Sequence, residues 1–112
     1  MWILTADGFY SIVQKPWDRE PGTLTVRARA PDDLDRLRVQ LPALGPTVED
    51  PAADYRWRAQ VAAWELGSLM AQLIQRIDYD NFKRVVGKRL GPPRAALYHE
   101  VWDVLRELQE ER

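Results

Sequence analysis

Cysteine is absent from this chain of 112 residues, and histidine occurs once. The lack of cysteine excludes disulfide bonds and thiol catalysis, and one histidine alone cannot build a usual zinc site. No stretch reaches the roughly 18 apolar residues of a membrane span. No basic region precedes the apolar residues at the N-terminus. We therefore expect a cytoplasmic protein with no membrane partner.

The charges of the chain nearly cancel, with 16 basic and 17 acidic side chains and a net charge of −1. This balance argues against a protein that coats nucleic acid or anionic membranes through bulk charge alone. The sequence contains no glycine-rich phosphate loop and no dinucleotide-binding fingerprint, and no serine lies in a nucleophile-elbow motif. Any anion site must therefore be local, and we expect no cofactor.

The length and the apolar pattern predict a single α+β domain spanning residues 1–112. We expect an antiparallel sheet of about four strands, with three to four helices packed mainly on one face. The expected strands lie within residues 2–15, 23–29 and 55–61, and a surface loop lies within 42–54. The expected helices begin at Pro31, near Trp64, after Asp80 or Asn81, and near Arg94.

Two stretches of the chain alternate arginine with apolar residues, at positions 26–30 and 55–59. Successive side chains of a strand point to opposite faces, so Arg27 and Arg29 share one face, as do Arg56 and Arg58. The residues between them, including Tyr55, are expected to point the other way. If the two strands are neighbours, the four arginines, helped by Lys15, form one anion-recognising surface.

Guanidinium groups bind phosphate and carboxylate in a bidentate manner, and an aromatic side chain such as Tyr10 can stack on a base. The leading partners are therefore nucleic acid, above all a single strand, and an acidic protein surface. We expect a non-enzymatic binding or interaction protein, and the sequence assigns no catalytic and no metal-binding residue.

Three alternatives remain open. In the first, the arginines form ion pairs within the chain, with carboxylates such as Asp7, Asp54, Asp78 or Asp80. A metal-dependent hydrolase or phosphoryl-transfer enzyme would use Asp78 and Asp80 to hold Mg²⁺, although this segment lacks the glycine and the later glutamate of a calcium loop. In the third, the arginine-bearing face forms the interface of a symmetric homodimer.

The C-terminal helix carries two further patterns. His99 and Asp103 are four residues apart, so we expect them to pair on the helix surface. Five apolar residues are expected on one face of the same helix: Leu97, Val101, Val104, Leu105 and Leu108.

Four segments of the chain resemble a family of short bacterial proteins of unknown function. They are MWILT at residues 1–5, GFYSIVQK at 8–15, LTVRAR at 24–29 and DYDNFK at 78–83. The resemblance spans most of the chain and implies a compact bacterial cytosolic domain. It carries over no catalytic role, so the expected function rests on the arginine pattern.

Overall fold

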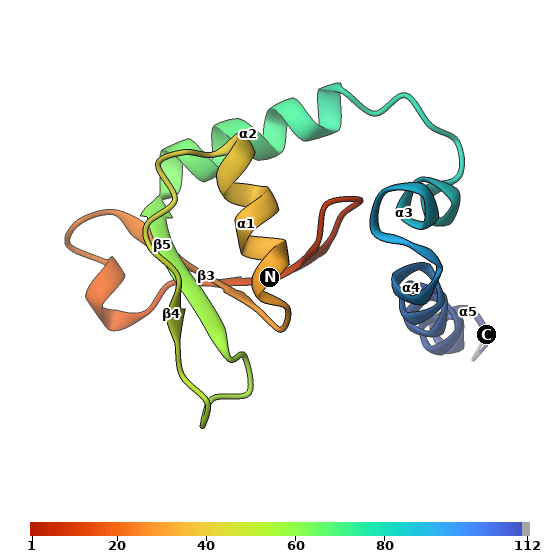
Figure 1. The fold of residues 1–112 in the computed structure, drawn as a ribbon, viewed down its shortest axis with the longest axis horizontal. Coiled ribbons are helices and arrows are strands. Elements are labelled where there is room, and N and C mark those ends of the chain that lie inside the picture. Colours follow the sequence, from red (N-terminus) through yellow and green to blue (C-terminus); the bar gives the residue numbers. More distant parts are fainter. Residues whose placement is uncertain (111–112) are drawn as a thin grey trace. The chain divides into compact units, whose positions relative to one another are not determined.

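The computed structural model describes residues 1–110 and divides the chain into two compact units. The first unit contains residues 1–4 and 8–78, and the second contains residues 5–7 and the chain from Tyr79 onward. The first unit holds the entire described sheet (Figure 1). The single domain expected over residues 1–112 stays a prediction, and residues 111–112 lie outside the described part.

Five strands form one antiparallel sheet in the order β1-β2-β3-β5-β4. Their bounds are β1 Trp2–Leu4, β2 Phe9–Val13, β3 Thr23–Ala28, β4 Val48–Glu49 and β5 Trp57–Ala62. The predicted α+β fold is confirmed, with five strands rather than about four. The additional strand, β4, lies in the segment predicted as a loop. The sequence did not indicate it because a strand of two residues is too short to show an alternation.

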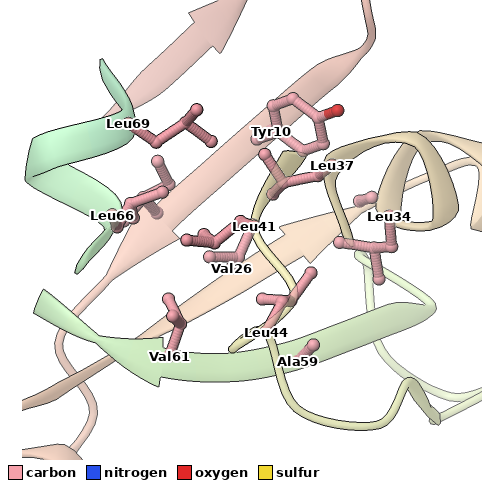
Figure 2. Close-up of a cluster of buried hydrophobic side chains, with 12 residues drawn as sticks. Tyr10, Val26, Leu34, Leu37, Leu41, Leu44, Ala59, Val61, Leu66 and Leu69 are labelled. Carbon is pink, nitrogen blue, oxygen red and sulfur yellow. The ribbon is translucent and has the colours of Figure 1, made fainter. Parts of the chain in front are cut away.

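Two helices cover one face of the sheet: α1 (Pro31–Gln40) and α2 (Ala63–Gln75). Proline at the first position of α1 and two acidic residues in its first turn favour a helix start there. Figure 2 shows leucines of both helices pointing toward the strand side chains. The inward residues of β3 and β5 are buried: Val26, Ala28, Ala59 and Val61. Period-two alternation therefore fixes which face of each strand is core.

Asp33 ties the first turn of α1 to the start of β2. Its Oδ2 accepts a hydrogen bond from the backbone N–H of Phe9 at 3.0 Å, and its carbonyl accepts one from the Tyr10 hydroxyl at 2.7 Å. Gly8 passes so close that a Cβ there would lie 2.7 Å from Asp33 Cγ and 2.7 Å from the Tyr10 hydroxyl oxygen. Only glycine fits this approach without displacing one of them.

The second unit contains α3 (Phe82–Leu90), α4 (Pro92–Leu105) and the short α5 (Glu107–Glu110). Asn81 Oδ1 accepts from the backbone N–H of Arg84 at 3.0 Å, which confirms the predicted cap. Gly91 separates α3 from α4 with a φ of 93°, in the left-handed region that favours glycine. None of the helices within residues 1–110 combines the length and the apolar character that crossing a membrane requires.

The predicted pairing of His99 with Asp103 is wrong. Nδ1 of His99 lies 2.8 Å from Nζ of Lys83 on α3, whereas Asp103 pairs with Arg106 at 3.2 Å. Arg106 lies three residues after Asp103 and carries a permanent charge, so it is the stronger partner for the carboxylate.

The five apolar residues predicted on one face of the C-terminal helix are exposed in the structure.

We expect Gly8→Ala to lower the free energy of unfolding by about 1–3 kcal/mol, because the added methyl must displace Asp33 or Tyr10. Urea unfolding followed by circular dichroism measures the change. Gly67→Ala is the matched control, since a Cβ at that α2 position meets nothing within 4 Å. It should raise stability by about 0.5–1 kcal/mol. Equal effects of the two substitutions would contradict this account of Gly8.

Candidate anion-binding surface

The arginines of β3 and β5 meet across a pair of neighbouring strands. Arg27 lies directly opposite Arg58 in the antiparallel register. The same row continues across the sheet, with Ser11 opposite Arg27 and Trp2 opposite Ser11. Directly opposite residues of an antiparallel sheet share a face. Arg27 and Arg58 therefore lie on one face, the one that α1 and α2 leave free within the first unit.

Arg29 joins this face through an aromatic contact. The guanidinium carbons of Arg27 and Arg29 each lie 4.6 Å from the ring centroid of Tyr55, which is only 4% exposed. The expectation that Tyr55 points away from the arginines is wrong. Tyr55 precedes β5 in a bend, so the period-two alternation of the strand does not extend to it. Phe9 of β2 also contacts this ring, with 6.4 Å between centroids.

Arg56 differs from the other three arginines because its charge is already paired. Its Nε lies 2.5 Å from Oε2 of Glu49 on β4, and its guanidinium carbon lies 5.2 Å from the ring centroid of Trp57. The pair exists because β4 places Glu49 directly opposite Trp57, beside Arg56. No alternation in the sequence indicates β4, so Glu49 was not among the predicted carboxylate partners.

Arg27, Arg29 and Arg58 form no ion pair with any carboxylate in residues 1–110. One Arg27 Nη donates to the Ser11 hydroxyl at 2.6 Å, and one Arg58 Nη donates to the Tyr55 carbonyl at 3.1 Å. The Nε atoms of Arg27 and Arg58 are buried without a hydrogen-bond partner in the described part of the chain. We call these three residues the arginine face.

Lys15 is not brought to the arginine face. It follows β2 and precedes the 3₁₀ helix η1 (Pro16–Asp18), four residues beyond Ser11. At about 3.3 Å per residue, that separation is about 13 Å along the strand direction. The backbone N–H of Lys15 donates to Asp18 Oδ2 at 2.8 Å, so its position is set by η1.

A fully buried carboxylate, Asp18, anchors η1 to the same side of the sheet as the arginine face. It accepts hydrogen bonds from the hydroxyls of Thr23 at 2.6 Å and Thr25 at 2.8 Å, and from Gln60 Nε2 at 3.0 Å. Burial raises the pKa of Asp18, but the bonds from Thr23, the Lys15 backbone, Thr25 and Gln60 outweigh it and lower the pKa below its ordinary value. The alternating Thr23 and Thr25 were the only sequence signal of this site.

A cavity of about 300 Å³ lies next to the arginine face. Its lining includes Trp17, Thr25, Pro46, Val48, Arg58 and Gln60. Arg58 therefore contributes to both features. The cavity is lined by four separate segments, namely η1, β3, the residues around β4, and β5, which is why no local pattern predicted it.

The carboxylates proposed for a metal site do not gather a full set of ligands. Within residues 1–110, no three histidine, cysteine, aspartate or glutamate side chains form a group that could hold a metal ion. Asp78 and Asp80 thus lack a third such ligand in the described part of the chain.

No family model matches the chain, and no curated protein or solved structure is significantly similar to it. The resemblance to short bacterial proteins therefore stays a prediction, and the arginine face must be interpreted from its own geometry.

We expect Asp18→Asn to lower the free energy of unfolding by about 1–3 kcal/mol at neutral pH, because the amide cannot accept all four hydrogen bonds. The lowered pKa of Asp18 means that its carboxylate stabilises the fold fully above the unfolded value of 3.8. That contribution is lost as the pH falls below 3.8 through the folded pKa. Urea unfolding of both proteins from pH 7 to pH 3 should show the difference shrinking, and a constant difference would contradict the role of the carboxylate.

We expect Arg58→Met to leave the free energy of unfolding unchanged or to raise it by up to about 1 kcal/mol. The substitution keeps the apolar stem but removes a charge that faces Arg27 and a buried Nε without a partner. Arg56→Met is the matched control, because it breaks the pair with Glu49 and should cost about 0.2–1 kcal/mol. Thermal unfolding at low and high salt measures both. A clear destabilisation by Arg58→Met would make Arg58 a structural residue.

Proposed function

We propose that this protein binds single-stranded nucleic acid through the arginine face and that it works by binding rather than by catalysis. A cytoplasmic location is part of the proposal. The observation that supports it best is that three arginines on one sheet face have no carboxylate partner among the described residues.

The arginine face lowers the stability of the protein when no ligand is bound. Like charges directly opposite each other across two strands destabilise a sheet, and a buried donor without a partner costs about 1–3 kcal/mol. Arg27 and Arg58 are like charges directly opposite each other, and each also has a buried Nε without a partner. A phosphate beside the two guanidinium groups would supply an opposite charge to both and acceptors for their Nη donors. The arrangement is therefore suited to an anionic ligand.

Aromatic side chains beside the arginines favour nucleic acid over an acidic protein surface. Trp2 is 70% exposed and lies in the same cross-strand row as Arg27 and Arg58. Its ring packs edge-on against Phe9, with 6.0 Å between centroids. Known single-strand-binding sheets stack two or three bases on aromatic rings that lie beside basic groups. An acidic protein surface would need the arginines but not the exposed ring.

Two of the predicted site residues have smaller roles in this proposal. Arg56 is neutralised by Glu49 and adds little net charge to the surface. Lys15 lies beyond the Asp18 network, so it would contact only a ligand that extends past the arginine face.

We expect wild-type protein to bind a fluorescent single-stranded oligonucleotide with strong salt dependence. Each neutralised phosphate contributes about −0.7 to the log–log slope, so three arginines predict a slope of about −2. Replacing Arg27 and Arg58 together by glutamine should reduce the slope to about −0.7 and weaken binding roughly tenfold at low salt. Fluorescence anisotropy measures both quantities, and circular dichroism checks that the variant is folded.

Arg76→Gln is the control for charge removal, because Arg76 follows α2 and its guanidinium donates to Gln72 Oε1. It should bind like the wild type. Equal binding by all three proteins would contradict the proposal. Binding of an acidic peptide but not of the oligonucleotide, lost in the double variant, would assign the face to a protein partner. A dimer that dissociates in the double variant would assign it to self-association.

A further inference from the structure

The cavity beside the arginine face has walls that are fixed by hydrogen bonds. Gly45 donates its backbone N–H to the Gln60 carbonyl at 2.8 Å. One Arg38 Nη donates to the Gly45 carbonyl at 2.8 Å and to the Thr47 hydroxyl at 2.8 Å. The loop that carries Gly45 is therefore held against the edge of β5. The Asp18 carboxylate holds two other lining residues, Gln60 and Thr25. The cavity is thus formed before any ligand arrives.

The groups at this cavity suit a flat ring with a polar edge. Trp17 is 55% exposed and supplies an aromatic surface, and Val48 and Pro46 add apolar lining. Because Nε2 of Gln60 donates to Asp18, its Oε1 is left as a hydrogen-bond acceptor. Arg58 lines the cavity, and its Nη groups are hydrogen-bond donors. A ring can therefore stack on Trp17 while its edge meets one donor group and one acceptor.

The size of the cavity and the positive charge beside it limit which ligands fit. The cavity volume of about 300 Å³ lies at the lower end of the range for ligand cavities. It suits one small ring system better than a larger molecule. The wall formed by Arg58 is shared with the arginine face, where Arg27 lies directly opposite. A ligand that occupies both places needs a flat ring linked to a negatively charged group.

We infer that this cavity holds one base of a bound single strand, stacked against Trp17, while the adjoining phosphate lies between Arg27 and Arg58. The inference rests on the proposed function and adds a base-recognition site to it. It also requires that affinity depend on the bases and not only on the phosphates of the strand.

The test replaces Trp17 by leucine, which removes the ring, and by phenylalanine, which keeps a ring. The probes are a fluorescent oligothymidylate and an abasic strand with the same number of phosphates. Stacking of one base on an aromatic side chain predicts that Trp17→Leu binds the oligothymidylate roughly tenfold more weakly. Binding of the abasic strand should not change, and Trp17→Phe should recover most of the loss.

Trp64→Leu is the matched control, because Trp64 is 75% exposed on α2. It should bind both strands like the wild type, and thermal unfolding should show all variants folded. The salt slope of Trp17→Leu should equal that of the wild type, since no charge is removed.

The outcomes separate the two proposals. If wild-type protein binds neither strand, the proposed function fails. If it binds both strands equally well and Trp17→Leu has no effect, the protein binds phosphates but the base site is wrong. If Trp17→Leu weakens binding of the oligothymidylate and of the abasic strand equally, that result would also contradict a base site.

Discussion

The antiparallel pairing of β3 with β5 is the constraint on which both faces of the sheet depend. One register aligns Val26 with Ala59 and Arg27 with Arg58. Because side chains alternate along a strand, burying the first pair against α1 and α2 forces the second pair onto the opposite face. A shift by one residue would place guanidinium groups in the core. The hydrophobic effect that selects the register therefore also assembles the arginine face.

The opposite face is stabilised locally rather than by a second apolar core. Asp18 ties η1 to β3 and β5 through three side-chain hydrogen bonds. Tyr55 is buried under Arg27 and Arg29, whose flat guanidinium groups contact its ring. These contacts hold the arginines in place but do not neutralise them. A positively charged surface with rigid supports is the arrangement expected for a site that meets an anion without large rearrangement.

Local patterns predicted the strands and helices well, and alternation predicted which residues share a face within each strand. The common face of Arg27 and Arg58 also needed the pairing of β3 with β5, which no local pattern determines. They failed where the position of a side chain depends on segments distant in the sequence. The pair between Arg56 and Glu49 needs β4, and the burial of Tyr55 needs the bend before β5. The Asp18 network and the cavity likewise need η1 to fold back on the sheet. His99 meets Lys83 only because α3 packs beside α4.

The central claim is that an anionic strand binds between Arg27 and Arg58. The most direct measurement is NMR of the arginine Nε–H groups of the full chain during titration with a single-stranded oligonucleotide. We predict that the Nε–H signals of Arg27 and Arg58 shift together and reach saturation at the same ligand concentration, because one phosphate bound beside both guanidinium groups changes the surroundings of both. The signal of Arg76 should remain unchanged. Unchanged signals of Arg27 and Arg58 in a sample that binds the strand would contradict the claim.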